Sequence, residues 1–577
     1  MPFSSANKIQ HCLYNTGVGD GVVSEYSGFK DCNITIHTYV WMEKQTKYLH
    51  FELTVENDEK SQLSNIKWPS PIESKPCKDG YAVLPIMQGM LLPDSEPNEI
   101  HNFMTGRMLS RESSMPWWGQ VSQKEGYIAI VETLWDAEYW YYHQYDSGTS
   151  VGISWLPSLG TMRYTRKMQL HFYEKCNYVS LCKDFRAYEK ALGKLVTLKE
   201  KVIKNPLLEN MIGTTVIYTP SVYWHCEPES DYYDKENPEK NDFIHSFSWI
   251  GQQLKEIKAR GIDQAYVHID GWGQAGYDNK HPDVLPPSPK SGGAEGFSQL
   301  LQDMRQMNYI PAVHDQYRDY YVRAESYDEQ QAVLMTNGEI DRETMWPGGS
   351  QGVLCAMLAP AYVTRNYSKM EEMDILPDGA YLDVFSVIEL DECDNPAHRM
   401  TRKECMEKRI ECFEIIRSKG LIISSEESVS EYVSHLDLVN HGPYSYALMD
   451  YYKVEPFGIP VPLFNLVYHD CLLIPWCVDD PVWGIGKDES GFLHGLLNGG
   501  LPSVSTTVSD KNIANANFLG RLHKEVGKSE MLSHSFLDTS GKNQQTIFGS
   551  GTKVTVDFDR NTYEIVWSDK TMTNGKI

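Results

Sequence analysis

The chain has 577 residues, of which 53 are Lys or Arg and 78 are Asp or Glu, so its formal net charge is −25. Nucleic acid and anionic membrane surfaces would repel such a chain, and we exclude both as its main partner. Aromatic residues form 12% of the sequence, which argues against intrinsic disorder. The length predicts several domains with cores large enough to fold without disulfides or metals.

The N-terminal segment and the cysteines bear on the cellular compartment. Segment 1–17 has no basic stretch followed by an apolar stretch, so no signal peptide is predicted. No apolar run is long enough for a transmembrane helix. The 12 cysteines form no CxxC pair and show no zinc-finger spacing with histidine. These features predict free thiols in the cytoplasm, or a periplasmic location if a leader has been removed.

The first 200 residues have the pattern of antiparallel β-structure. Segments 33–39, 48–55 and 162–173 alternate apolar and polar side chains, as half-buried strands do. Segment 185–202 has Ala, Leu, Lys and Glu at helical spacing. We therefore predict an N-terminal β-sandwich with a linker helix over residues 1–200.

From about residue 212, short apolar runs alternate with helical patterns. Eight strands interleaved with helices predict a (β/α)8 barrel over residues 201–507. A doubly wound sheet is the main alternative, but no Gly-rich dinucleotide fingerprint follows the first strand. The predicted strands are 214–219, 265–270, 309–315, 380–385, 421–426, 436–440, 461–469 and 502–505. The helical patterns between them include 241–260, 296–307, 402–419 and 491–497.

The remaining residues, 508–577, return to a β-pattern. Segments 553–558 and 562–567 alternate apolar and polar residues and predict a hairpin that turns at 559–561. We therefore predict a small C-terminal β-domain, which makes the whole chain an α/β and β multidomain protein.

Six consecutive predicted barrel strands end in polar residues. In a barrel, active-site residues come from the carboxyl ends of the strands and from the loops that follow. A purely structural barrel does not need carboxylates or imidazoles at so many of these positions. The strand-end residues are His268, Asp270 and Trp272; His314, Asp315 and Tyr317; Asp383; Glu426 and Glu427; Asn440 and His441; and His469 and Asp470.

Asp383 and Glu426 are the best pair for chemistry. Two carboxylates on adjacent strands suit glycoside hydrolysis, in which one attacks or activates water and the other, kept protonated, donates a proton to the leaving oxygen. The alternative role for Asp383 is a helix N-cap. Glu427 competes with Glu426, because successive strand residues point in opposite directions. Because the register at a strand end is uncertain, the alternation of side chains does not decide which of the two glutamates faces the pocket.

The aromatic residues near the strand ends have two interpretations. Trp272, Tyr317, Trp346 and Trp476 can stack on a sugar ring or pack at the rim. The dipeptides His314–Asp315 and His469–Asp470 can hold sugar hydroxyls, bind a metal or belong to the core. No HxH or HExxH motif marks a zinc hydrolase, and oxygen-rich ligands would favour Ca²⁺.

Several short motifs, in order along the chain, resemble the barrel of glycoside hydrolase family 129 and, more distantly, family 101. They are HIDGWGQ (268–274), WPGGSQGVLCAMLAPAYV (346–363), AYLDVFS (380–386), SSEES (424–428) and VPLFNLVYHDC (461–471). The resemblance implies a retaining glycosidase with Asp383 as nucleophile and Glu426 as acid/base. It also implies a bound Ca²⁺ near the site and no organic cofactor. Asp270 and Asp315 are our candidates for calcium ligands or for sugar-hydroxyl ligands.

The resemblance leaves two substrates open for an exo-acting enzyme on a terminal galacto-configured sugar. One is α-linked N-acetylgalactosamine of mucin-type glycans, and the other is 3,6-anhydro-D-galactose of carrageenan oligosaccharides. A sulfated carrageenan substrate would need local cations, because the chain is acidic. The candidates for such cations are Arg318, Arg342 and Arg365.

Two other functions compete with a glycosidase. One is a catalytically silent carbohydrate-binding barrel, which would have aromatic platforms without a converging carboxylate pair. The other is a metal-dependent barrel hydrolase, which would hold its metal with His268, Asp270, His314 and Asp315. The substrate-binding residues that we expect are Asp270, Trp272, His314, Asp315, Tyr317, Trp346, Glu427, His469 and Asp470.

Overall fold

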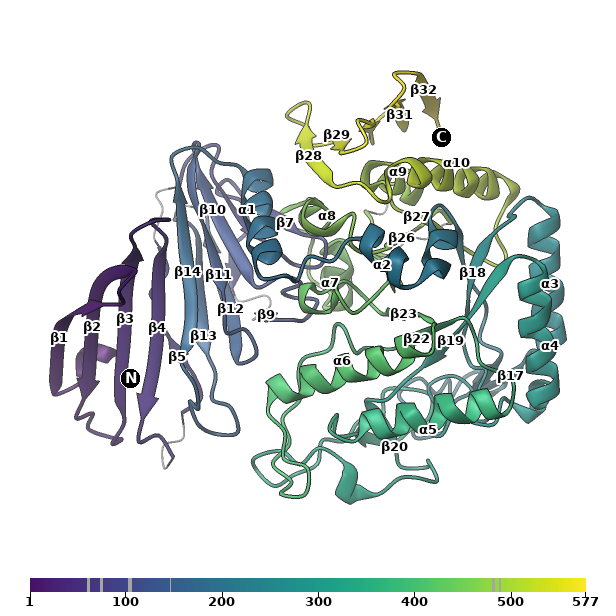
Figure 1. Cartoon of the computed structure of the whole chain (residues 1–577), viewed down its shortest axis with the longest axis horizontal. Coiled ribbons are helices and arrows are strands. Elements are labelled where there is room, and N and C mark those ends of the chain that lie inside the picture. Colours follow the sequence, from purple (N-terminus) through teal and green to yellow (C-terminus); the bar gives the residue numbers. More distant parts are fainter. Residues whose placement is uncertain (60–62, 73–75, 102–105, 146, 480–482, 487–488) are drawn as a thin grey trace.

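The computed structural model describes residues 1–59, 63–72, 76–101, 106–145, 147–479, 483–486 and 489–577. The chain is a mixed α/β multidomain protein with a nearly closed parallel barrel of eight strands and separate β-sheets. Strands of the first 173 residues form one side of the molecule, the barrel forms the other, and the C-terminal strands lie beside the barrel (Figure 1).

Two antiparallel sheets form the N-terminal part. In the ten-stranded sheet the order is β1 (Lys8–Asn15), β2 (Gly19–Ser27), β3 (Thr35–Glu43), β4 (Leu49–Glu56), β14 (Arg166–Tyr173), β11 (Glu125–Val131), β10 (Trp117–Ser122), β6 (Tyr81–Leu84), β7 (Met90–Pro93) and β25 (Ile459–Pro460). The second sheet has β5 (Ile66–Lys67), β13 (Gly148–Trp155), β12 (Ala137–Gln144) and β8 (Ile100–His101), and β9 (Gly106–Arg107) also pairs with β12. The predicted strands at 33–39, 48–55 and 162–173 are therefore confirmed as β3, β4 and β14.

Two short helices replace the single helix predicted over 185–202. They are α1 (Tyr178–Ala191) and α2 (Leu198–Lys204), and each begins with a capping box, at Asn177 and at Thr197. Between them Gly193 has φ +72°, a left-handed conformation that ends a helix and is easiest for glycine. The periodicity of the side chains continues across this break, which is why the sequence reads as one helix.

The central sheet is the predicted barrel. Its parallel strands, in spatial order, are β24 (Leu438–Val439), β23 (Ile422–Ser425), β22 (Gly379–Leu382), β19 (Tyr309–Asp315), β18 (Ala265–Ile269), β15 (Thr215–Tyr218), β27 (Leu501–Ser505) and β26 (Pro475–Cys477). A single bridge between Leu438 and Leu473 links the two edge strands. The main helices around the barrel are α3 (Phe247–Ala259), α4 (Gly293–Gln306), α5 (Ala359–Glu372), α6 (Arg402–Ser418), α7 (Tyr446–Tyr451) and α9 (Gly491–Asn498).

One predicted barrel strand is wrong. Segment 461–469 forms the helix α8 (Leu463–Tyr468), in which every residue is buried, and the true strand is β26. A short apolar run that is buried on all sides has no amphipathic period, so sequence alone does not distinguish helix from strand there. Just before α8, the short strand β25 lies outside the barrel and pairs with β7 of the N-terminal sheet.

A buried lysine fills the seam between the edge strands. The Lys201 ammonium donates hydrogen bonds to the carbonyls of Val433, Leu436 and Cys471. These carbonyls lie in the segments that precede the two edge strands, where the hydrogen bonds between barrel strands do not reach them. Burial lowers the pKa of Lys201 to about 8, because the charged form is desolvated.

The tail begins with a helix that the β-pattern did not predict. Helix α10 (Asp510–Val526) packs against β27 and β15. An antiparallel sheet follows, with β28 (Met531–Phe536), β29 (Asn543–Phe548), β30 (Lys553–Asp557), β31 (Thr562–Val566) and β32 (Met572–Lys576). The predicted hairpin is confirmed as β30 and β31. In the part of the chain that the structure describes, no helix combines the length and the apolar character that crossing a membrane requires.

Candidate active site

Asp383 and Glu426 immediately follow two residues that face each other in the barrel. Leu382 at the end of β22 pairs with Ser425 at the end of β23, and neighbouring strands lie about 4.8 Å apart. The next residue of each strand therefore begins its loop at the same place on the carboxyl rim. The backbone N–H of Asp383 donates to the Asp315 carbonyl at 2.9 Å, which ties this rim position to β19.

The carboxylate of Asp383 is held in the ionised form. The Tyr381 hydroxyl donates to Oδ1 at 2.5 Å, and His314 Nε2 lies 3.7 Å from Oδ2. Burial alone would raise the pKa of Asp383, but His314 and Tyr381 outweigh burial and lower the pKa below its usual value. The carboxylates of Asp383 and Asp278 likewise overcome burial and raise the pKa of His314 to about 10. The site therefore holds an imidazolium beside an anionic carboxylate.

Glu426 is held in the opposite state. Burial, the charge of Asp383 and the charge of Glu427 raise the pKa of Glu426 to about 8, although Arg111 acts in the other direction. Arg111 Nη2 lies 3.0 Å from Glu426 Oε1, while Oε2 is buried and has no hydrogen-bond partner in the structure. A carboxyl with one unengaged oxygen and a raised pKa is protonated at neutral pH and able to donate.

Glu427 has a different environment from Glu426. Its Oε1 lies 3.5 Å from Arg111 Nη2 and 3.5 Å from His441 Nε2. Arg111 and His441 lower its pKa despite burial. Its side chain is 4% exposed, against 19% for Glu426. The charge of Asp383 acts on Glu426, so Glu426 is the better candidate for the acid, and Glu427 helps to hold Arg111.

The strand-end pattern missed Asp278, which lies in the long loop between β18 and α4. Asp278 Oδ1, His281 Nδ1 and His314 Nε2 lie within 4.8 Å of one another. All three atoms are buried without a hydrogen-bond partner among the described residues. Burial and nearby carboxylates raise the pKa of Asp278 well above its usual value. Three unsatisfied polar atoms beside Asp383 form a ready site for hydroxyl groups.

The other residues after β18 and β19 take different places. Asp270 accepts a hydrogen bond from His268 at 2.8 Å and keeps a partly exposed side chain near His314. Asp315 is fully buried, and the Tyr317 hydroxyl donates to it at 2.6 Å. Asp315 and Tyr317 are therefore buried and bonded to each other, which argues against direct contact with a sugar.

The three tryptophans predicted as sugar platforms lie in different environments. Trp272 is buried, donates from Nε1 to the His314 carbonyl at 2.7 Å and stacks on Phe297, so neither face of its ring is free for a sugar. Trp476 is buried as well. Trp346 is only half-buried and lies at the rim, because its loop is anchored by the hydrogen bond from Gly348 N to the Asp278 carbonyl at 2.9 Å. One face of the Trp346 ring stacks on Tyr232, with ring centroids 5.5 Å apart, so only its other face could meet a sugar.

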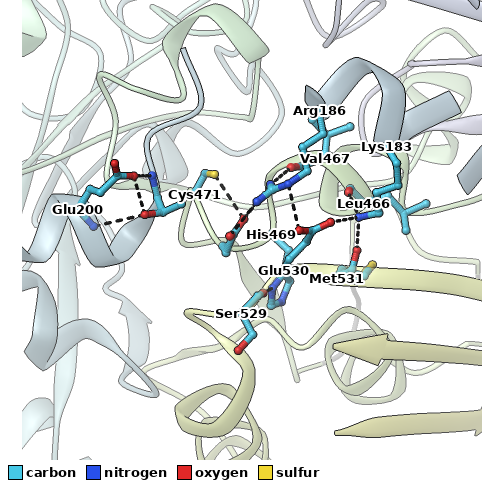
Figure 2. Close-up of polar contacts among 12 residues, drawn as sticks. Lys183, Arg186, Glu200, Leu466, Val467, His469, Cys471, Ser529, Glu530 and Met531 are labelled. Atoms are coloured by element: carbon cyan, nitrogen blue, oxygen red, sulfur yellow. Dashed lines mark hydrogen bonds and ion pairs between the residues drawn. The ribbon is translucent and has the colours of Figure 1, made fainter. Parts of the chain in front are cut away.

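His469 and Asp470 lie away from the barrel rim, because the segment before them is helix α8. The His469 ring bonds the carbonyls of Ser529 at 2.7 Å and Gly499 at 3.2 Å. Both oxygens of Asp470 accept from Arg186 at 2.9 Å. Figure 2 shows Arg186 and Lys183 bonded to Glu530, and His469 beside Ser529, where α1, α8 and the C-terminal part meet. The side chains of His469 and Asp470 are both used to join parts of the fold, which argues against their predicted role in substrate binding.

The candidate calcium ligands do not form a cation site together. Asp270 and Asp315 are engaged by His268 and Tyr317, and neither belongs to a group of three or more metal-ligand side chains among the described residues. The group of two carboxylates at Glu426 and Glu427 already has the Arg111 cation at 3.0 Å. Calcium takes six to eight oxygen ligands, so calcium binding stays a prediction without assigned ligands.

The four residues of the alternative metal hydrolase also fail to converge. No three of His268, Asp270, His314 and Asp315 form a ligand group in the described ranges. The cations considered for a sulfated substrate are all paired with carboxylates: Arg318 with Asp391 at 3.0 Å, Arg342 with Glu329 at 3.2 Å and Arg365 with Asp283 at 2.9 Å.

A parallel barrel with an aspartate and a glutamate at the ends of neighbouring strands has the carboxylate pair that glycoside hydrolases use. Comparisons with known proteins agree. The chain is similar to the alpha-N-acetylgalactosaminidase NagBb from Bifidobacterium bifidum in its GalNAc complex, with 34% identity, a TM-score of 0.93 and coverage of 98% of this chain and 92% of that chain. With the ligand-free form of NagBb the identity is 35% and the TM-score is 0.92, and the match covers 98% of this chain and 93% of that chain. The chain therefore belongs to the family of NagBb, glycoside hydrolase family 129.

More remote comparisons add less. The GH36 alpha-galactosidase AgaA from Geobacillus stearothermophilus has 10% identity, a TM-score of 0.54 and coverage of 97% of this chain and 79% of that chain, which shows a shared fold alone. The family model that matches residues 235–475 is described as a domain of unknown function, DUF6259. The search of curated proteins found no match.

Proposed function

We propose that the protein is an exo-acting, retaining glycosidase that releases terminal α-linked N-acetylgalactosamine. The observation that carries this proposal is the opposite protonation of Asp383 and Glu426, which follow paired residues on adjacent strands. A retaining mechanism needs this division between an anionic nucleophile and a neutral acid at about 5–5.5 Å.

In the first step, Asp383 attacks the anomeric carbon and Glu426 donates its proton to the leaving oxygen. The bond to the aglycone breaks, and a covalent glycosyl-enzyme forms. Tyr381 and His314 orient the carboxylate of Asp383 through its two oxygens.

The second step needs Glu426 as a base. The negative charge of Asp383 is one cause of the raised pKa of Glu426. Once Asp383 is esterified, that charge is gone, so the pKa of Glu426 falls and its carboxylate takes a proton from water. The water then releases the sugar with its original anomeric configuration. The same electrostatic pair thus serves both half-reactions.

The sugar is oriented by groups beside Asp383. Asp278 Oδ1 and the neighbouring His281 and His314 nitrogens are unsatisfied, and sugar hydroxyls both donate and accept hydrogen bonds. We propose that Asp278 accepts from a hydroxyl of the terminal sugar and that Trp346 stacks on its ring.

The sugar identity rests on the relative. NagBb is named an alpha-N-acetylgalactosaminidase and was solved with GalNAc, and this chain matches it over 98% of its length. For a sulfated carrageenan substrate the chain offers none of the three nominated arginines free, because each is paired with a carboxylate. We therefore favour N-acetylgalactosamine over 3,6-anhydro-D-galactose.

Product analysis tests this proposal. The purified protein is given an aryl α-N-acetylgalactosaminide and, separately, a neocarrabiose oligosaccharide, and NMR follows the first-formed anomer. We expect hydrolysis of the first substrate with the α-anomer appearing first. Asp383→Asn should lower kcat by roughly 10⁴-fold and Glu426→Gln by about 10²–10⁴-fold. A β-anomer as first product would contradict the retaining mechanism, and turnover of the neocarrabiose alone would contradict the sugar.

A further inference from the structure

Two long barrel loops bring three potential metal ligands together. Cys355 belongs to the loop between β19 and α5, and Cys393 and His398 belong to the loop between β22 and α6. The two sulfurs and an imidazole nitrogen lie within 4.8 Å of one another. The cysteines are 38 positions apart (393 − 355), so no short spacing motif reveals the group.

The contact between Cys393 and His398 has the length expected of two ligands of a tetrahedral zinc ion. Zn–S bonds of about 2.3 Å and Zn–N bonds of about 2.0–2.1 Å place neighbouring ligand atoms roughly 3.6 Å apart. Cys393 Sγ lies 3.4 Å from His398 Nδ1. The thioether of Met400 lies 3.9 Å from Cys355 Sγ, but zinc takes Cys, His or carboxylate ligands, so the fourth ligand of the proposed site is water.

The group is also supported from outside. His398 Nε2 bonds the Gln330 carbonyl at 2.7 Å, which requires the proton on Nε2 and leaves Nδ1 with a lone pair directed at Cys393. A backbone carbonyl at the far nitrogen is the usual partner of a metal-bound histidine. The backbone N–H of Leu334 donates to Cys393 Sγ at 3.4 Å, an arrangement that stabilises a thiolate.

We propose that Cys355, Cys393 and His398 bind a Zn²⁺ ion that fastens the two loops to each other. Two thiolates and a neutral imidazole around Zn²⁺ carry no net charge, so the assembly can be buried at low cost. Binding releases the two thiol protons to solvent. Sulfur ligands select zinc over calcium, so this site is separate from any calcium site near the sugar.

The position of the site gives it a structural role. The first loop carries Trp346 and Arg318, and the second carries Asp391, which Arg318 contacts at 3.0 Å. Both loops rise from strands next to Asp383. A metal that joins them would hold the rim of the pocket without touching the sugar.

Metal analysis of the full-length protein tests the proposal. We expect about one zinc per chain after purification with zinc in the medium. After metal removal, Co²⁺ should restore the site and produce the intense thiolate-to-metal charge-transfer absorption that only cysteine ligation gives. Zinc below one tenth per chain, together with no such absorption on Co²⁺ addition, would overturn the proposal. So would a Cys355–Cys393 disulfide found by mass spectrometry in protein kept under reducing conditions.

Variants locate the metal. Cys393→Ala and His398→Gln should each weaken zinc binding by at least about tenfold in a chelator competition. Cys412→Ala is the matched control, because Cys412 is buried on the neighbouring helix α6 but lies outside the group. Zinc binding that survives Cys393→Ala, or that is lost equally in Cys412→Ala, would contradict the assignment. The wild-type Co²⁺ spectrum decides the matter even if a variant fails to fold.

Discussion

The Arg111 guanidinium, which comes from the N-terminal β-sheets, lies 3.0 Å from Glu426 Oε1 at the end of barrel strand β23. It also lies 3.5 Å from Glu427 Oε1. The backbone holds Arg111 through the hydrogen bond from Met87 N to the Arg111 carbonyl at 2.9 Å. The N-terminal sheets therefore complete the electrostatic environment of the proposed acid, and they are more than a separate attachment to the barrel.

Replacing Arg111 should change the protonation of Glu426. Arg111 lowers the pKa of Glu426, so Arg111→Met should shift the basic limb of the pH–rate profile to higher pH. Steady-state kinetics across pH 4–10 measure this shift. Arg107→Met is the control, because Arg107 pairs with Glu389 at 3.6 Å and does not contact Glu426. An unshifted basic limb in Arg111→Met would show that Arg111 does not act on the acid.

The pH profile of the wild-type enzyme follows from the protonation of Asp383 and Glu426. Activity requires Asp383 ionised and Glu426 protonated. The pKa of Asp383 is lowered and that of Glu426 is raised to about 8, so kcat/KM should be level near neutral pH, fall as pH rises through about 8 and fall in acid only below the usual pKa of an aspartate. Because the folded pKa of Glu426 is raised, its contribution to stability is present below the unfolded pKa and is lost as pH rises through about 8. A basic limb below pH 6 would contradict the role of Glu426.

Asp278 should act through substrate binding and orientation. Its Oδ1 is buried and has no hydrogen-bond partner among the described residues beside His314, and a substrate hydroxyl left without its buried partner costs about 1–3 kcal/mol. Asp278→Asn keeps the size of the side chain and should lower kcat/KM by roughly 10–100-fold, while the product anomer stays the same. Asp270→Asn is an informative comparison, because Asp270 already accepts from His268. We expect a smaller loss there, and equal losses would argue against a special role for Asp278.

The sequence predicted this site only in part, for physical reasons. Asp383 and Glu426 were found because parallel strands bring their carboxyl ends to one rim, so position in sequence translates into position in space. Arg111 and Asp278 follow no such rule, since Arg111 comes from a turn between β9 and β10 of the N-terminal part and Asp278 from the middle of a barrel loop. Segment 461–469 was misread because a run buried on all sides carries no period. Cys355 and Cys393 meet only through tertiary folding.

The corrected role of Asp470 gives the last prediction. Its carboxylate binds Arg186 through two hydrogen bonds of 2.9 Å, and both side chains are mostly buried, at 11% and 12% exposure. Removing one partner leaves the Arg186 charge without its main anion, which should cost about 2–3 kcal/mol and lower Tm by several degrees. Because Asp470 lies away from the barrel rim, Asp470→Asn should keep kcat/KM within about twofold of the wild type at a temperature where both are folded. Thermal unfolding and kinetics on the same samples separate the two effects, and Asp383→Asn should differ by lowering kcat roughly 10⁴-fold in the folded protein. A large loss of kcat/KM in folded Asp470→Asn would return this residue to the active site.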